Sequence, residues 1–361
     1  MAVANQSVVR RVVFRVDASV RGGMGHLRRC AVLGRHLKSR GVQSFFAVRA
    51  PDVDAGFEVG DFATDCRVLP KDVSGTLDAE WTAAWCRDVG ADRLVIDHYD
   101  ADEPYQKALH AQGVRWLQFD GATALPLWAD WVLSTVPAIP ESEFLPRGRR
   151  PGIRWLIGPR YAILREEFMR SRPPRVIPRE ARRLLLCFGG GDDYGANEVC
   201  LEALRQIGWT APVDLAVGSG CPALGTLRRI ADSRLSFPLH LHVDANDMAD
   251  LLSSADLAII AGGTTTFEAA AMGTPTLMIR TVPNQLPNTS GWQKLGAGID
   301  LGDVSELVPA IVGEQVRSVA ADCARRTAMT AAGTAQVDGH GPERILDALC
   351  APIQPSPDDA T

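Results

Sequence analysis

The stretch Asp256–Pro275, DLAIIAGGTTTFEAAAMGTP, decides the fold class of this chain. Its apolar run Leu257–Ala261 has the length and composition of a buried strand. A Gly-Gly turn follows, three threonines come next, and residues 266–272 then form a helical pattern that ends at Gly273. A buried strand that leads through a glycine turn into a helix is the unit from which parallel α/β sheets are built.

The start of this predicted helix is suited to a nucleotide. Backbone N–H groups and hydroxyls there can hold a pyrophosphate, and Glu268 in the first turn can accept hydrogen bonds from both ribose hydroxyls. The alternative is a capped helix in which Glu268 balances the dipole. That alternative does not explain the Gly-Gly turn and the Gly-x-Pro ending together. We therefore expect Gly263, Thr264, Thr265 and Glu268 to bind a nucleotide.

Strands and helices alternate on both sides of a proline-rich middle segment, which predicts two α/β domains with parallel sheets. The basic run 147–150 in the middle segment is expected to be a solvated linker rather than an anion site. The predicted boundaries are an N-terminal domain over 8–155, a connector over 156–181, a C-terminal domain over 182–345 and a disordered tail over 352–361. The segment beyond about residue 310 carries no motif that we can interpret.

Composition excludes several classes of protein. The chain has 361 residues with 46% hydrophobic and 22% charged residues, which is ordinary for a globular enzyme of about two domains. A net charge of −5 and an aromatic content of 6% argue against nucleic-acid binding. Eight scattered cysteines without a C-x-x-C pair predict reduced, mostly buried thiols. With no secretory signal or apolar stretch of membrane-spanning length in the sequence, we expect a cytoplasmic location.

The N-terminal half has its own glycine turn, Gly22-Gly23-Met24-Gly25-His26, between a predicted strand and a predicted helix. It matches neither a complete dinucleotide fingerprint nor a P-loop. His26 would stand at the helix start, where the helix dipole favours a neutral imidazole that can accept a proton. A capping or gap-filling histidine is the alternative. Asp17, at the end of the preceding strand, could orient the imidazole ring, bind a sugar hydroxyl or belong to a turn.

Other strand ends carry further candidates for ligand contacts. Asp97-His98-Tyr99-Asp100 suits a sugar pocket or an ordinary turn. The glycine loops around Gly190 and Gly218, and the pair Asn284-Gln285, could reach the phosphates or the sugar. His240-x-His242 has too few neighbouring ligands for a metal, so a structural role is expected. The sequence predicts neither a metal site nor a cofactor.

Five segments together resemble the UDP-2,4-diacetamido-2,4,6-trideoxy-β-L-altropyranose hydrolase family of pseudaminic acid biosynthesis. They are Arg15–Cys30, Val95–Asp100, Gly158–Phe168, Cys187–Asp193 and Asp256–Pro275. The second half is also similar to the UDP-GlcNAc transferase of peptidoglycan synthesis. The resemblance implies a glycosyltransferase-B fold, an α/β class with two Rossmann-like domains that face each other across a cleft.

The resemblance also implies a site. UDP would lie on the C-terminal domain with its ribose on Glu268, and the sugar would lie against the N-terminal domain. His26 would be the general base for inverting attack of water on C1, and Tyr99 would contact the sugar. Asp17, Gly25, Asn284 and Gln285 complete the expected substrate contacts, and Gly190 and Gly218 the nucleotide contacts. A small-molecule UDP-sugar is the expected partner.

Two alternatives to the hydrolase remain open. A glycosyltransferase of the same fold would use His26 to activate an acceptor hydroxyl, and a nucleotide-sugar sensor would keep the pocket without the chemistry. UDP release from the purified protein without an acceptor distinguishes the three.

Overall fold

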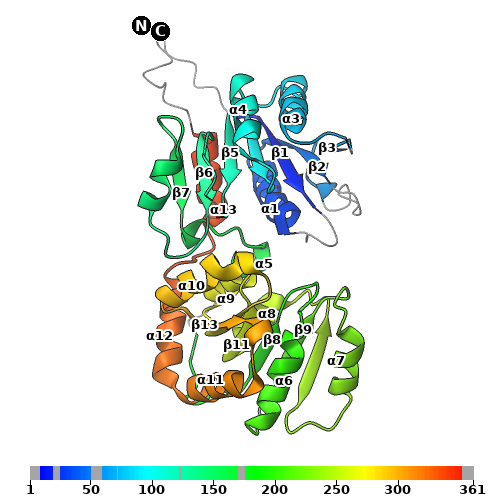
Figure 1. Ribbon diagram of the computed structural model, residues 1–361, viewed down its shortest axis with the longest axis vertical. Coiled ribbons are helices and arrows are strands. Elements are labelled where there is room, and N and C mark those ends of the chain that lie inside the picture. Colours follow the sequence, from blue (N-terminus) through cyan, green and yellow to red (C-terminus); the bar gives the residue numbers. More distant parts are fainter. Residues whose placement is uncertain are drawn as a thin grey trace. The chain divides into compact units, whose positions relative to one another are not determined.

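A computed structural model describes residues 9–18, 25–49, 59–70, 72–121, 124–169 and 175–351. The chain divides into two compact units (Figure 1). The N-terminal unit comprises residues 1–135, 139–165 and 340–361, and the C-terminal unit comprises 136–138 and 166–339. The division differs from the predicted boundaries, because residues 156–165 and the last helix belong to the N-terminal unit. The predicted tail, 352–361, lies outside the described residues.

The N-terminal unit is built on a seven-stranded parallel sheet in the order β3-β2-β1-β4-β5-β6-β7. Its strands are β1 (Arg11–Asp17), β2 (Gln43–Arg49), β3 (Asp65–Val68), β4 (Arg93–Asp97), β5 (Trp116–Phe119), β6 (Trp131–Ser134) and β7 (Arg154–Ile157). The interior strand β1 packs apolar side chains on both faces, since Val12, Phe14 and Val16 join one apolar cluster and Val13 joins another.

Helices cover both faces of this sheet. On one face, α1 (Gly25–Ser39) packs beside α13 (Gly341–Cys350), so the end of the chain returns to the first domain. On the other face, α3 (Thr76–Asp88) packs against α4 (Glu103–Ala111). Short 3-10 turns, η1 (Glu141–Glu143), η2 (Leu145–Arg147) and η3 (Pro159–Tyr161), connect the last strands.

The C-terminal unit has a six-stranded parallel sheet in the order β10-β9-β8-β11-β12-β13. Its strands are β8 (Leu184–Cys187), β9 (Val213–Val217), β10 (Leu239–Val243), β11 (Leu257–Ala261), β12 (Thr276–Arg280) and β13 (Gly298–Asp303). Its helices are α5 (Glu166–Met169), α6 (Ala196–Gln206), α7 (Leu224–Ala231), α8 (Met248–Ser254), α9 (Thr265–Met272), α10 (Leu286–Lys294), α11 (Pro309–Ala321) and α12 (Cys323–Thr334), with the 3-10 turns η4 (Pro283–Gln285) and η5 (Val304–Glu306).

The proline-rich middle segment is more ordered than its sequence predicts. Strand β7 adds to the edge of the first sheet, parallel to β6. The prediction that the basic run 147–150 is a solvated linker is wrong, because Arg147 donates two hydrogen bonds to the buried carboxylate of Asp120, at 2.7 and 3.0 Å. Arg150 lies 3.5 Å from Asp130. Both arginines therefore fasten the segment to the sheet instead of facing water alone.

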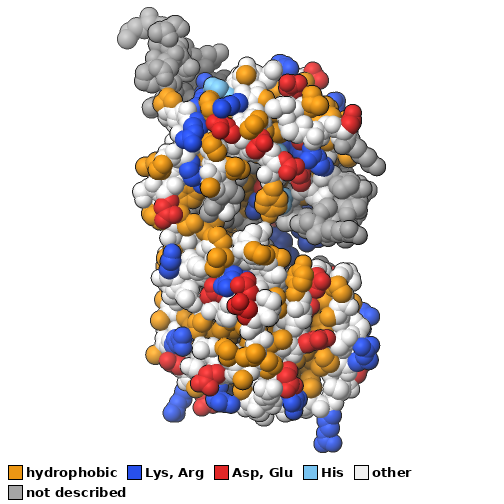
Figure 2. Space-filling view, in the orientation of Figure 1, with side chains coloured by type: hydrophobic (Ala, Val, Ile, Leu, Met, Phe, Trp, Pro, Cys, Tyr) orange, Lys and Arg blue, Asp and Glu red, His pale blue; other side chains and the backbone are white. Residues whose placement is uncertain are grey.

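Two simpler predictions can be compared with the structure. All eight cysteines are free, and five of them are buried, as expected for small apolar side chains. None of the helices in the described part of the chain has the length and apolarity needed to cross a bilayer. On the face drawn in Figure 2, acidic and basic side chains are interspersed over the described residues of both units.

Candidate functional site

His26 and Asp97 meet at the carboxyl edge of the first sheet. Strands β1 and β4 are neighbours, with Val16 opposite Asp97. His26 is the second residue of α1, the helix that follows β1, and Asp97 is the last residue of β4. The chain therefore brings together a helix start and a strand end that are 71 residues apart. The other glycines of the turn, Gly22 and Gly23, lie outside the described residues.

The carboxylate of Asp97 fixes the imidazole of His26. The Nδ1 atom of His26 lies 2.6 Å from Oδ1 of Asp97, whose side chain is 1% exposed. Arg29, one helical turn beyond His26, donates from Nε and Nη2 to the two oxygens of Asp97, each at 2.5 Å. The guanidinium of Arg29 also lies over the ring of Phe119, 4.6 Å from its centroid. Together with the thiol of Cys30, which donates to Oδ2 at 3.6 Å, these neighbours hold the orientation of Asp97.

Asp97 is ionised in this arrangement. Burial by itself would raise the pKa of its carboxyl, but the charge and hydrogen bonds of Arg29, together with His26, hold that pKa well below its usual range. A carboxylate accepts hydrogen bonds only, so Nδ1 of His26 carries the proton and donates it to Asp97. Nη2 of Arg29 is 3.1 Å from Nδ1, but both groups are then donors, so this is a close approach rather than a hydrogen bond. The lone pair of Nε2 is left as the basic site of the ring.

Tyr99 lies beside the same imidazole. Its ring meets that of His26 edge to face, with centroids 4.8 Å apart and an interplanar angle of 81°. The residue is 72% exposed, so the phenol is open to solvent and to a ligand. Gly25 begins α1, and a Cβ there would meet no atom of the described residues within 4 Å. Of the predicted N-terminal residues, His26, Tyr99 and Gly25 therefore lie together.

The first role predicted for Asp17 was to orient the imidazole ring of His26, and the structure gives Asp17 other neighbours. Its Oδ1 accepts from Nη1 of Arg15 at 2.5 Å, whereas the ring of His26 is oriented by Asp97. Arg15 is fully buried and also donates to both oxygens of Asp78. Asp17 therefore belongs to a charged cluster beneath the strand ends, and the ring-orienting role falls to Asp97. Sequence reasoning placed Asp97 only in a polar strand end and missed Arg29, since a pairing over 68 residues leaves no local pattern.

In the C-terminal unit, one of the predicted glycines, Gly218, is required by close packing of backbones. A Cβ on Gly218, after β9, would lie 2.3 Å from the carbonyl oxygen of Gly190, after β8. No side chain fits there, so the two glycine loops lie against each other at the carboxyl edge of the second sheet. The acidic pair that follows has a local explanation, because Asp193 accepts from the backbone N–H of Asn197 in the first turn of α6 at 3.1 Å.

The Gly262-Gly263 turn is held by the next helix, α10. The amide nitrogen of Asn288 donates to the carbonyl of Gly262 at 2.6 Å and lies 2.9 Å from Oγ1 of Thr266. A Cβ on Gly262 would lie 2.4 Å from Cγ2 of Thr289. The turn is therefore a packed, fixed element at the start of α9. Asn288 was missed by sequence reasoning because nothing near it in sequence indicates its partner.

The start of α9 keeps donors available for a ligand. Thr264 is exposed and Thr265 is half-buried. Within the part of the chain that the structure describes, the backbone N–H groups of these two threonines have no acceptor. Thr266 instead turns inward and donates its hydroxyl to the carbonyl of Gly263 at 2.7 Å. Glu268 is half-buried in the first turn of the helix.

In the predicted pair Asn284-Gln285, one side chain is exposed and the other is hydrogen-bonded. Asn284 is exposed, whereas Oε1 of Gln285 accepts from the backbone N–H of Thr281 at 2.9 Å. A Cβ on Gly263 would lie 3.8 Å from Nε2 of Gln285, so this amide stands beside the glycine turn. Both residues are in η4, which follows β12 at the same sheet edge as α9.

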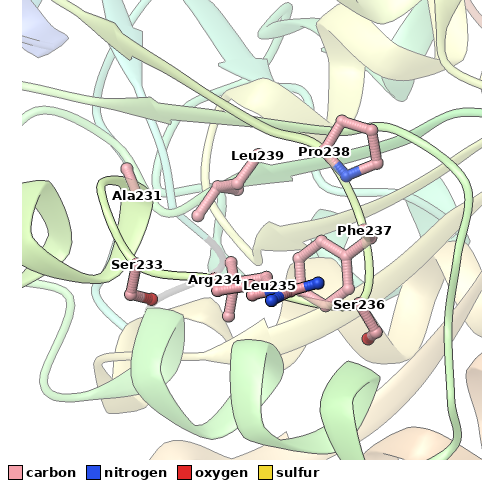
Figure 3. Close-up of a pocket in the computed structure, with 8 residues that line it drawn as sticks. All are labelled: Ala231, Ser233, Arg234, Leu235, Ser236, Phe237, Pro238 and Leu239. Atoms are coloured by element: carbon pink, nitrogen blue, oxygen red, sulfur yellow. The ribbon is translucent and has the colours of Figure 1, made fainter.

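Two surface depressions lie elsewhere, at the edge strand β10. One of about 400 Å³ is lined by Ser233–Leu239 together with Ala231 (Figure 3). The second includes His240 and His242 among its lining residues. His242 is paired with the buried Asp214 through Nε2 at 2.9 Å, and among the described residues neither histidine belongs to a group of three metal-ligating side chains. The structural role expected for His242 is consistent with that pairing.

No family model matches the chain. The spore coat polysaccharide biosynthesis protein SpsG of Bacillus subtilis (strain 168) is 29% identical over 195 residues, which are 53% of this chain and 57% of SpsG. The chain thus spans little more than half the length of that relative.

Solved structures resemble it over nearly its whole length. MurG of Acinetobacter baumannii superposes with a TM-score of 0.69 and 16% identity, covering 94% of this chain and 99% of MurG. MnaA of S. aureus, in a co-structure with UDP, gives a TM-score of 0.66 and 12% identity over 96% of this chain and 99% of MnaA. The chain has the glycosyltransferase-B fold. The predicted fold class, two Rossmann-like α/β domains, is confirmed.

Proposed function

We propose that this protein hydrolyses a UDP-linked amino sugar at its anomeric carbon, with His26 as the general base. The observation that carries the proposal is the Asp97–His26 pair, with Nδ1 and Oδ1 2.6 Å apart at the carboxyl edge of the first sheet. This edge is where open α/β sheets bind their ligands. The pair has the arrangement of a base and its orienting carboxylate, in which the second ring nitrogen accepts the proton.

The second unit supports the nucleotide part of the proposal. Thr264 and Thr265 offer backbone N–H groups that have no acceptor among the described residues, at a helix start where the helix dipole favours a diphosphate. Glu268 stands in the same turn and is the proposed ribose ligand. The glycine loops at Gly190 and Gly218 present backbone without side chains at the same sheet edge. MnaA, a structure of similar fold, was solved with UDP.

The chemistry balances with the chain's own groups. Nε2 of His26 takes a proton from water as the water oxygen bonds to C1, and the C1–O bond breaks with its electron pair leaving on UDP. UDP is a good leaving group, so no strong general acid is required. Attack from the face opposite the leaving group inverts the anomeric configuration. Deprotonation by a positioned histidine contributes roughly 10²–10⁴-fold to rate, and helix-start N–H groups stabilise the charge that grows on the diphosphate.

A glycosyltransferase is the second candidate. The same Nε2 would deprotonate an acceptor hydroxyl in place of water, and the relative SpsG carries a name from polysaccharide biosynthesis. Tyr99, which is exposed beside His26, could contact either a sugar or an acceptor. The nature of the nucleophile therefore has to be measured.

Release of UDP from a panel of sugar nucleotides tests the proposal. The panel contains UDP-GlcNAc and UDP-linked 2,4-diacetamido-2,4,6-trideoxy sugars, each with and without candidate acceptors. Release without an acceptor, with an inverted free sugar as product, is the expected result. Release only with an acceptor would replace the hydrolase by a transferase, and binding without any release would indicate a nucleotide-sugar sensor.

A further inference from the structure

A second group of side chains at the carboxyl edge of the first sheet is not used by the proposed reaction. One ring nitrogen of His98 and one carboxylate oxygen from each of Asp17 and Asp100 lie within 4.8 Å of one another. Asp17 ends β1, and His98 and Asp100 follow β4, which is its neighbour in the sheet. We propose that these three side chains bind a borderline divalent cation of the Mn²⁺, Co²⁺ or Zn²⁺ class.

His98 is the observation that points to a ligand. The residue is 8% exposed, and within the described part of the chain neither of its ring nitrogens has a hydrogen-bond partner. Its ring packs edge to face against buried Tyr105, with centroids 5.0 Å apart, and so is held in place. Buried polar atoms are almost always paired, and each exception requires an explanation such as an ion or a water that occupies the site. A metal ion would use the lone pair of the ring nitrogen that faces the carboxylates.

The two carboxylates give this buried imidazole a route to solvent. Oδ2 of Asp100 lies 3.0 Å from Nη1 of Arg49, and the side chain of Asp100 is 62% exposed. Oδ1 of Asp17 is likewise paired with Arg15. Each carboxylate has a second oxygen beyond the one that its arginine holds. An ion could therefore enter from the exposed side without displacing either arginine.

Charge at the cluster favours a cation. Three carboxylates, Asp17, Asp78 and Asp100, face the two guanidiniums of Arg15 and Arg49, so the cluster carries net negative charge. Arg15 and Arg49 both pair with Asp78 as well, so their positive charge is shared among the three carboxylates. A divalent ion would balance the remaining negative charge and satisfy the imidazole in the same step.

The ligand chemistry selects the class of ion. Mg²⁺ and Ca²⁺ prefer sets made only of oxygen, whereas one imidazole with carboxylates suits first-row transition metals and zinc. Metal–ligand bonds of about 2.0–2.2 Å place neighbouring ligand atoms roughly 3–4 Å apart, a separation that side-chain rotation reaches from the observed spacing. Three protein ligands leave coordination positions open to water or to an oxygen of a bound ligand.

Metal binding by the full chain without any sugar nucleotide tests the site directly. The protein, freed of metal by chelator and dialysis, is titrated with Mn²⁺, and free Mn²⁺ is counted by its electron paramagnetic resonance signal. Co²⁺ is titrated in parallel and read by its visible absorption. One saturable site is expected, with Mg²⁺ and Ca²⁺ competing weakly. Loss of a ligand should weaken binding by on the order of 10–100-fold, as loss of outer-sphere partners already does.

Three variants make the result specific. His98→Gln removes the buried imidazole, and Asp100→Asn removes an exposed carboxylate whose loss leaves the packing intact. His240→Gln removes an exposed imidazole from the other unit and serves as the control. Weaker binding in the first two variants and unchanged binding in the third support the site. Absence of saturable binding, or binding that Asp100→Asn and a folded His98→Gln leave unchanged, would overturn it. Neither outcome depends on whether the protein hydrolyses a UDP-sugar.

Discussion

Replacement of Asp97 by asparagine should move the proton of His26 to the wrong nitrogen. In the native protein, Asp97 accepts from Nδ1 of His26 at 2.6 Å and from Arg29 at 2.5 Å on both oxygens. Arg29 can only donate, so in Asp97→Asn the amide oxygen turns toward Arg29 and the amide NH₂ group turns toward His26. Nδ1 must then accept, the proton moves to Nε2, and the nitrogen that should act as the base is blocked.

The cost can be estimated from this geometry. Loss of a correctly oriented base is worth on the order of 10²–10⁴ in turnover, or about 3–5 kcal/mol of barrier. Folding should suffer less. The variant loses a fully buried carboxylate, but about a third of the Arg29 side chain stays in water. We therefore expect the free energy of unfolding to fall by about 1–3 kcal/mol. We expect kcat to fall and KM to stay within about threefold.

Two measurements check this prediction. UDP release is followed under steady-state conditions for the native protein, Asp97→Asn and Asp88→Asn, the last of which removes an exposed carboxylate from α3 in the same unit. Nitrogen-15 NMR of the imidazole reports the tautomer of His26 without any substrate. A folded Asp97→Asn that keeps the Nδ1–H tautomer, or that turns over substrate within threefold of the native rate, would show that Asp97 does not set the tautomer of a catalytic His26.

Three further substitutions have expected outcomes in the C-terminal unit. Gly218→Ala should weaken UDP binding at least tenfold and lower the free energy of unfolding by about 1–3 kcal/mol, because its Cβ would strike the backbone of the neighbouring loop at 2.3 Å. Calorimetry measures the affinity and urea unfolding the stability. Gly225→Ala, whose Cβ would meet no described atom closer than 4.0 Å, should change neither. Asn288→Ala removes the hydrogen bond to the Gly262 carbonyl that fixes the turn. It should weaken UDP binding without a change in the free sugar released per UDP. An unchanged affinity for UDP would count against a role for the turn. Asp214→Asn should lower the free energy of unfolding by about 1–3 kcal/mol near neutral pH. Burial would raise the pKa of the Asp214 carboxyl, but hydrogen bonds from Arg183 and His242 hold that pKa below its usual value. The stability that the carboxylate adds is therefore present above pH 4 and lost as the pH falls further. In urea unfolding, the difference in free energy of unfolding between the native protein and the variant should narrow below pH 4, and a difference independent of pH would contradict this.

Much of the fold could be predicted from the sequence because its signals are local. Strand β11, for example, begins and ends where the apolar run Leu257–Ala261 does. Strand β3, DCRV, was missed because it is short, polar and at a sheet edge, where one side faces water. Helix α13 was missed as part of the first domain because its packing against α1 joins residues about 300 apart.

The residues of the candidate site likewise include some with a local sequence signal and some without one. His26 could be found because a glycine turn before a helix is a local pattern, and the structure places it at a sheet edge. Its partner Asp97 could not be chosen over Asp17, since both end neighbouring strands and only the direction of their side chains separates them. The orphaned nitrogens of His98 have no sequence signal at all, because the absence of a partner becomes visible only once the chain is folded.

Hydrolysis with His26 as the base is tested most directly by the release of UDP from a UDP-linked amino sugar by purified protein without an acceptor, for the native chain and for His26→Asn. We expect steady release by the native protein and a loss of on the order of 10²–10⁴-fold in the variant. UDP affinity should stay unchanged in calorimetry, because the proposed nucleotide contacts lie in the other unit. A His26→Asn variant that releases UDP at close to the native rate would contradict the assignment of His26 as the base.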